Sequence, residues 1–252
     1  MFKSSQTSYI TEKLFLYLKF YLYAKIQQVS KASQKRIIVS VTNDLVADNR
    51  VHKVCNTLVK MGFSVLLVGR KLPQSQALTS REYDTKRFWL LFKNGPFFYA
   101  EYNMRLFLFL LLAKADILLS NDLDTLTANF YASKIRKVTL VYDSHEYFTE
   151  VPELIPRPHV QKIWKSLEKR MLPKIKYAYT VCESIAKIYQ KKYGTPFQVV
   201  RNVPRKKTFV AEPGNKKNHS EKIILYQGAV NIGRGLKQAK KKKKNIDNAK
   251  LV

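Results

Sequence analysis

The chain has 252 residues, of which 46% are hydrophobic and 12% aromatic, and it carries 46 lysines and arginines against 18 acidic residues, a formal net charge of +28. This apolar content excludes an intrinsically disordered protein, and the length suits one large domain or two small ones. No uninterrupted apolar run reaches the roughly 18 residues of a membrane-spanning helix. The two cysteines, Cys55 and Cys182, are too few for a disulfide scaffold. Both stand in apolar segments, which predicts buried free thiols in a reducing, cytoplasmic setting.

The positive charge is spread along the chain. Residues 237–252 contribute +6, so the rest of the chain carries +22. Such a surface attracts phosphates, anionic lipid headgroups or nucleic acid, although a well-solvated lysine-rich surface has the same charge. No helix-turn-helix, RNA-binding aromatic motif or zinc finger is visible, so no specific nucleic-acid partner is expected.

Short apolar runs alternate with segments of helical periodicity from Lys35 onward. Strands are predicted at residues 36–41, 63–68, 87–92, 117–120, 138–142, 179–182 and 197–200, the third of them at an edge. Helices are predicted at residues 51–61, 97–113, 124–134, 158–172 and 183–193, and a turn at residues 94–96. This alternation predicts an α/β fold with a Rossmann-like, doubly wound parallel sheet. Sheets of this kind bind ligands beyond the carboxyl ends of their strands.

Changes in composition divide the chain. Residues 35–203 hold the alternating pattern. Residues 1–34 form an N-terminal extension, which is either a helix packed on the domain or on a membrane surface, a signal or anchor, or a segment of little structural role. A polar linker at 204–221 leads to the start of a second α/β domain at 222–236, and 237–252 is a lysine-rich, aberrant tail.

Six segments in order resemble bacterial family 4 glycosyltransferases of the two-domain GT-B fold. They are RIIVSVTNDLVADNRVHKVCNTLVKMGFSVLLVGR, ADILLSNDLDTLTANFYASK, LVYDSHEYFTEVPEL, AYTVCESIAKIYQKKYG, VVRNVP and ILYQGAVNIGRGL, within residues 35–236. The resemblance implies an N-terminal domain that faces the acceptor and a C-terminal domain that holds a nucleotide-sugar donor. It implies hexosyl transfer with retention of configuration, without a metal or cofactor, to a saccharide or lipid-linked acceptor in envelope polysaccharide biosynthesis.

The motif Asp143-Ser144-His145-Glu146 follows a predicted buried strand, so it lies at the carboxyl edge of the sheet. Asp143 and His145 point to one side if the strand geometry continues. The resemblance places a functional histidine in a comparable motif, which makes His145 the candidate catalytic residue. A histidine there can hydrogen-bond a sugar hydroxyl or steady the reacting oxygens. In the alternative, Asp143 and Glu146 cap the next segment while His145 fills a polar gap.

Other polar groups follow other strands. The resemblance implies that the loop with Asp48, Asn49 and Arg50 approaches the donor and acceptor cleft, although Asp48 or Asn49 is equally suited to a helix N-cap. Among Asn121, Asp122 and Asp124, one is expected to cap a helix and another to line the acceptor cleft. Asn202 stands at the domain junction, where a turn role fits equally well.

The candidate phosphate-binding residues are Gly228, Gly233, Arg234 and Gly235, which follow the strand predicted from residue 222. Backbone amides of such a loop at a helix N-terminus can hold a diphosphate, to which Arg234 adds charge. The alternative is a plain tight turn. No cysteine–histidine cluster with metal-ligand spacing is present.

The chain departs from the family where the donor domain is expected. The resemblance implies a Glu-x7-Glu pattern beyond the glycine-rich loop, and no such pattern follows. Five consecutive lysines suggest a slip of the reading frame, so we expect a truncated chain with little or no transferase activity alone.

The competing function is a basic binding module for anionic membrane or nucleic acid without catalysis. The helix predicted at 97–113 is the candidate for peripheral contact with the inner face of the cell membrane, since Arg105 and Lys114 suit an interface. The alternative for this helix is a core position under the sheet. A dinucleotide-binding enzyme is disfavoured because residues 42–50 contain no glycine.

Overall fold

The computed structural model describes residues 34–46, 48–203, 222–225, 238 and 249–251. The predicted linker, the glycine-rich loop with Gly228, Gly233, Arg234 and Gly235, and nearly all of the N-terminal extension and lysine-rich tail lie outside these residues.

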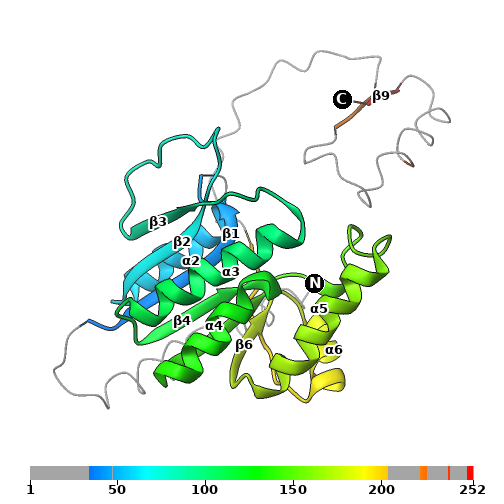
Figure 1. Ribbon diagram of the computed structural model, residues 1–252. Helices are drawn as coiled ribbons and strands as arrows, with labels where there is room; N and C mark the ends of the chain where they lie inside the picture. Colours follow the sequence, from blue (N-terminus) through cyan, green and yellow to red (C-terminus); the bar gives the residue numbers. More distant parts are fainter. Residues whose placement is uncertain (1–33, 47, 204–221, 226–237, 239–248, 252) are drawn as a thin grey trace, which may run out of the picture.

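Seven parallel strands form one sheet in the order β3-β2-β1-β4-β5-β6-β7 (Figure 1). They are β1 (Arg36–Asp44), β2 (Ser64–Lys71), β3 (Asp84–Trp89), β4 (Ile117–Asn121), β5 (Thr139–Ser144), β6 (Tyr177–Thr180) and β7 (Gln198–Val199). The helices between them are α2 (Asn49–Lys60), α3 (Gly95–Leu112), α4 (Asp122–Arg136), α5 (Pro158–Met171) and α6 (Glu183–Tyr193), with short 3-10 turns at Phe148–Glu150 and Leu172–Lys174. A separate parallel pair joins β8 (Lys222–Ile224) to β9 (Ala249–Leu251). The predicted α/β, Rossmann-like parallel sheet is confirmed.

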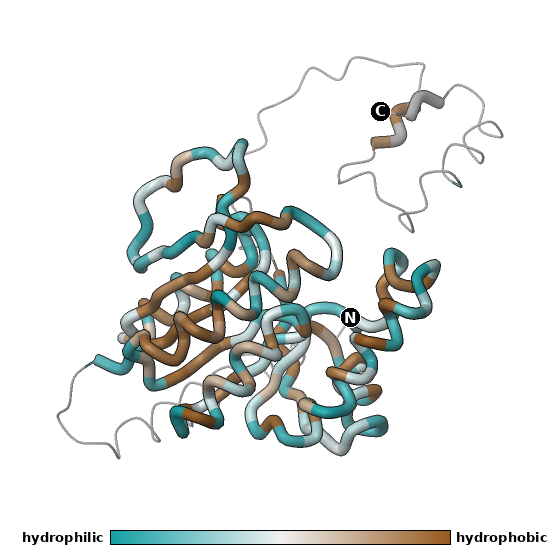
Figure 2. Tube along the Cα trace, viewed as in Figure 1, coloured by the Kyte–Doolittle hydropathy of each residue, from teal (hydrophilic) through white to brown (hydrophobic). Residues whose placement is uncertain are grey.

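Helices cover both faces of the sheet because successive side chains of each strand point to opposite sides. Ile37, Val39 and Val41 of β1 pack with α2 on one face, whereas Ile38 packs with α3 and α4 on the other. A third cluster joins α4, β5 and β6 to α5 and α6. The central strands are accordingly hydrophobic along their length (Figure 2), as expected for a sheet buried on both sides.

Two predicted boundaries were wrong at the periphery of the sheet. The third strand begins at Asp84, three residues before the predicted start, and it pairs by backbone with β2 from Leu66 onward. Most of its side chains are polar and exposed, since an edge strand has one neighbour, so its hydrophobic pattern is weak. The predicted turn at 94–96 is the start of α3, where Pro96 occupies the first turn.

The two cysteines differ in environment. Cys55 is fully buried, and burial raises the pKa of its thiol to about 12. The prediction that Cys182 is also buried was wrong. The sixth strand ends at Thr180, so Cys182 becomes the N-cap residue of α6 and is partly exposed. A hydrogen bond with the Ser184 hydroxyl, together with backbone N–H groups of α6, lowers the pKa of its thiol.

Candidate functional site

The reversal of strand order lies between β1 and β4. The chain runs outward from β1 through β2 to β3, and then crosses back to β4 on the other side of β1. Loops that leave the carboxyl ends of β1 and β4 therefore diverge, which opens the ligand position of a doubly wound sheet. The candidate residues after β1, β4 and β5 all stand at this edge.

His145 lies between two carboxylates that come from different loops. Its Nε2 is 2.7 Å from Asp122 Oδ2, and its Nδ1 is 3.5 Å from Asp143 Oδ1. The backbone N–H of His145 donates to the other Asp122 oxygen at 3.4 Å. The side chain is 16% exposed, and Nδ1 has no hydrogen-bond partner among the described residues. One carboxylate thus fixes both the ring and the backbone of His145, and the buried Nδ1 faces Asp143 without a hydrogen bond.

Asp122 holds this position through an unusual backbone. Its φ of 57° is left-handed, a region that non-glycine residues adopt at a cost of order 1 kcal/mol. The helix N-cap position is taken by Asn121, whose side chain makes no capping bond and instead donates to the Ser40 carbonyl at 3.2 Å. Asn121 therefore ties the end of β4 to β1, and Asp122 faces His145. Strained backbone of this kind is concentrated at functional sites.

The loop after β1 shows whether Asp48 or Asn49 caps the following helix. Asp48 is the N-cap of α2, with Oδ1 accepting the Val51 N–H at 3.1 Å. Its other oxygen lies 3.9 Å from Arg50 Nη2. Arg50 lies close enough to the cluster that its charge lowers the pKa of both Asp122 and Asp143. Asn49 is exposed at the first position of the helix.

Burial dominates the protonation of the acidic cluster. It raises the pKa of Asp143 to about 6, against the opposing effect of Arg50. It also raises the pKa of Asp124 to about 6, although the Thr42 hydroxyl donates a hydrogen bond to that carboxylate. For Asp122, burial and the neighbouring Asp124 raise the pKa well above its ordinary value. These carboxyl groups therefore lose their protons at higher pH than ordinary carboxyls, Asp124 and Asp143 near pH 6, a pattern that is frequent at functional sites.

Two candidates are exposed at the protein surface. Glu146 is exposed, and its charge raises the pKa of Asp122. Asn202 is exposed beyond the end of β7. Sequence reasoning missed Thr42 and Tyr179, which hydrogen-bond Asp124 and Asp143. The glycine-rich loop lies outside the described residues, so its role stays a prediction.

A model of Glycosyltransferase Family 4 matches residues 47–205. The chain belongs to glycosyltransferase family 4. Enzymes of this family are retaining hexosyltransferases that use a nucleotide-sugar donor and a sugar acceptor. A search of curated protein sequences found no significant match.

Solved structures with the same fold include three of differing function. Sucrose-phosphate synthase from Thermosynechococcus elongatus is 14% identical with a TM-score of 0.60, and the match covers 87% of this chain and 61% of that one. The lipopolysaccharide outer core galactosyltransferase WaaB is 12% identical with a TM-score of 0.53, covering 86% and 60%. A UDP-N-acetylglucosamine 2-epimerase described as putative, from Listeria monocytogenes, is 13% identical with a TM-score of 0.51, covering 87% and 62%. The chain thus spans less than two thirds of these proteins, and the fold alone does not distinguish transfer from epimerisation.

The site of this family 4 domain offers both hydrogen-bond donors and hydrogen-bond acceptors. Three buried polar atoms at its edge have no partner among the described residues: Arg50 Nη1, Asn121 Oδ1 and His145 Nδ1. Buried polar atoms are nearly always hydrogen-bonded, so three such atoms at one sheet edge point to a polar ligand. A donor, an acceptor and a histidine nitrogen together suit the hydroxyl groups of a sugar. No group of three His, Cys, Asp or Glu side chains within the described residues is arranged to hold a metal ion.

Proposed function

We propose that the cluster around His145 holds the sugars of a retaining glycosyl transfer from a nucleotide-sugar donor to a saccharide. The observation that carries the proposal is His145 at the carboxyl edge, held by Asp122 at 2.7 Å and flanked by Asp143 at 3.5 Å. Family membership supports the reaction class, and the three unpartnered polar atoms support a hydroxyl-rich ligand.

In such a transfer the bond from the anomeric carbon to the diphosphate breaks, and the diphosphate departs with the electron pair. The acceptor oxygen forms the new bond to the anomeric carbon and gives its proton to an oxygen of the departing diphosphate. Positive charge develops on the sugar in the transition state. The acidic residues beside His145 stabilise that charge, and His145 Nδ1 hydrogen-bonds a sugar oxygen. The diphosphate would be held by the loop with Gly228, Gly233, Arg234 and Gly235.

We assign the acceptor to the envelope polysaccharides, as a free or lipid-linked saccharide, and place the reaction in the cytoplasm at the inner face of the cell membrane. A sugar acceptor follows from the family. A net charge of +28 favours an acceptor that carries phosphate or is presented on an anionic surface.

Sugar binding can be tested without turnover by recording the histidine ring signals of the 252-residue chain by NMR while mono- and oligosaccharides are added. We expect the His145 signals to shift, and those of the exposed His159 to stay unchanged. His145→Ala should weaken sugar binding about three- to tenfold, since a hydrogen bond contributes about 0.5–1.5 kcal/mol. Saccharides that bind His145→Ala as tightly as the parent chain would contradict the assignment.

We further propose that transfer needs a second lobe to hold the nucleotide. The seven-stranded sheet and its helices form one Rossmann-like lobe, and we assign its site to the acceptor side. We therefore expect the purified chain alone to turn over nucleotide sugars slowly or not at all. Measured turnover by this chain would overturn that part of the proposal while leaving sugar binding intact.

A further inference from the structure

Helix α3 is apolar on the side that faces away from the sheet. Its inner face buries Phe98, Tyr102, Leu106 and Leu110. The outward side carries Phe97, Met104, Leu108 and Leu112, which are 67%, 60%, 53% and 88% exposed. A helix on a protein surface ordinarily turns polar residues outward, so this outer stripe is unusual.

Two charged residues, Glu101 and Arg105, share the outward side of the helix with the stripe. They pair with each other at 2.9 Å, so their charges cancel. The Glu101 carboxylate also accepts the backbone N–H groups of Leu91 and Phe92, at 3.0 to 3.1 Å. The acidic charge is thus used to fix the turn that precedes α3, and the helix keeps an apolar exterior.

The end of β3 and the following turn extend this surface. Trp89, Leu91 and Phe92 are 59%, 64% and 47% exposed, and the rings of Phe92 and Phe97 lie 5.3 Å apart. We call the whole set the α3 face: Trp89, Leu91, Phe92, Phe97, Met104, Leu108 and Leu112. Soluble monomers rarely expose large apolar patches unless they contact a partner.

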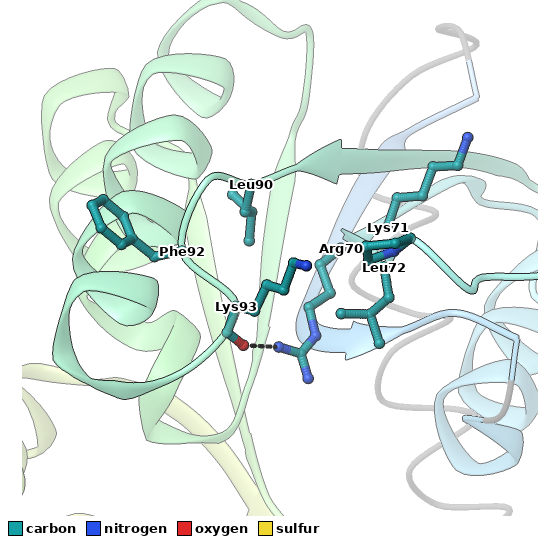
Figure 3. A pocket seen from close by; sticks show the side chains of 7 residues that line it. Arg70, Lys71, Leu72, Leu90, Phe92 and Lys93 are labelled. Atoms are coloured by element: carbon teal, nitrogen blue, oxygen red, sulfur yellow. Dashed lines mark hydrogen bonds between the residues drawn. The ribbon is translucent and has the colours of Figure 1, made fainter.

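Positive charge lies at both ends of the α3 face. Near the N-terminal end of the helix a hollow is lined by Arg70, Lys71 and Lys93 together with Leu72, Pro73, Leu90 and Phe92, and no acidic residue lines it (Figure 3). Arg70 stacks on Phe98 at 4.6 Å and donates to the Lys93 carbonyl at 3.1 Å.

A second hollow, near the C-terminal end of α3, contains Arg36, Lys86 and Lys114 beside Phe109 and Ala113. Its one acidic residue, Asp84, lies 4.0 Å from Arg36. The helix between the two hollows is therefore flanked by cations at both ends.

We propose that the α3 face docks on an anionic membrane, with α3 parallel to the bilayer surface and the cations of the two hollows against lipid headgroups. Apolar side chains between basic residues are the pattern of helices that lie in a membrane interface. None of the described helices is long and apolar enough to cross a bilayer. Each lysine or arginine near an anionic surface contributes about 1 kcal/mol, which distinguishes this partner from an uncharged apolar one.

Docking also explains the position of the site. Helix α3 begins at the carboxyl edge of β3, the edge of the sheet on which His145 stands. A docked lobe would present that edge close to the lipid surface, within reach of a lipid-linked acceptor. This last step rests on the proposed function, whereas docking itself rests on the α3 face alone.

The test is sedimentation of the full 252-residue chain with vesicles of phosphatidylcholine, with and without phosphatidylglycerol. We expect binding to the anionic vesicles that weakens with salt, and little binding to phosphatidylcholine alone. The pair Leu108→Asp with Leu112→Asp should weaken binding by about tenfold or more, as should Lys93→Glu with Lys114→Glu. Thermal unfolding of each variant verifies that it is folded.

Matched controls carry the same changes on exposed positions elsewhere. Val160→Asp with Ile163→Asp on α5, and Lys169→Glu with Lys174→Glu, should bind nearly as the parent chain does. Controls that weaken binding equally would show attraction by net charge alone and overturn the proposal. A parent chain that does not bind vesicles but forms a dimer would also overturn the proposal. If Leu108→Asp dissociates that dimer, the α3 face is assigned to a second copy of the chain. The NMR signals of His145, recorded with added sugar in the same variants, separate failure of membrane docking from failure of the proposed function.

Discussion

Asp143→Asn should raise the free energy of unfolding by about 2–3 kcal/mol near pH 8 and leave it nearly unchanged near pH 4. Asp143 is 3% exposed at the end of β5, and burial raises its pKa from the ordinary 3.8 to about 6. A buried carboxylate that must ionise destabilises the folded chain, and asparagine has a similar shape without the charge. The measurement is urea unfolding of both chains at the two pH values.

The direction in which stability changes with pH follows from the number of protons that the folded and unfolded states bind. In the unfolded chain Asp143 loses its proton near pH 3.8, whereas in the folded chain it keeps the proton to about pH 6. Between these values the folded state binds more protons, so its stability falls as the pH rises. Above about pH 6 the destabilisation is complete, and below 3.8 it vanishes. The gain from asparagine should therefore appear across this window.

Glu153→Gln is the control, because Glu153 is exposed in the loop before α5 and should have the same small effect at both pH values. A loss of stability in Asp143→Asn near pH 8 would show that attraction by Arg50 and His145 outweighs the effect of burial. Sugar binding should fall in Asp143→Asn if the ionised carboxylate serves the site. Stability and function would then oppose each other at this position, as is common at functional sites.

The hydrophobic pattern of the sequence predicted the bounds of a helix well where a glycine follows the helix. The α6 helix spans Glu183–Tyr193 as predicted, because Gly194 follows in a left-handed conformation with φ 69°. Gly62 follows α2 with φ 88°. The pattern failed at β3, whose residues are held by backbone pairing with β2 rather than by their own hydrophobicity. Such pairing depends on residues far away in the sequence.

The candidate site was predicted in outline for a topological reason. Parallel strands bring their carboxyl ends to one edge, so Asp122 and His145 meet although 23 residues separate them. The sequence could not show that Asp122 makes the closest contact to His145, because that depends on a left-handed backbone at Asp122. Nor could it show Thr42 and Tyr179 beside the carboxylates, since their partners come from other strands.

Gly69→Ala should destabilise the chain by about 2–3 kcal/mol, because the added methyl group has no room. A Cβ on Gly69 would lie 2.4 Å from Leu45 Cδ2 and 2.7 Å from the Asn43 carbonyl oxygen. Leu45 is completely buried. The Asn43 carbonyl belongs to the backbone at the end of β1, so neither atom can move away without shifting the loop that leads to Asp48.

Gly194→Ala serves as the comparison, since Gly194 has φ 69° with open space around it and its replacement should cost only about 1 kcal/mol. In a chain that already carries Leu45→Ala, Gly69→Ala should cost less than in the parent chain, although some cost persists because the Asn43 carbonyl remains. Denaturant unfolding of Gly69→Ala, Gly194→Ala, Leu45→Ala and the double variant measures these differences. If Gly69→Ala and Gly194→Ala lower the free energy of unfolding equally, the loop after β1 moves aside at little cost, which contradicts this prediction. If the loop is rigid, Gly69→Ala should also weaken sugar binding, since the contact at Gly69 sets where Asp48 and Arg50 stand beside the acidic cluster.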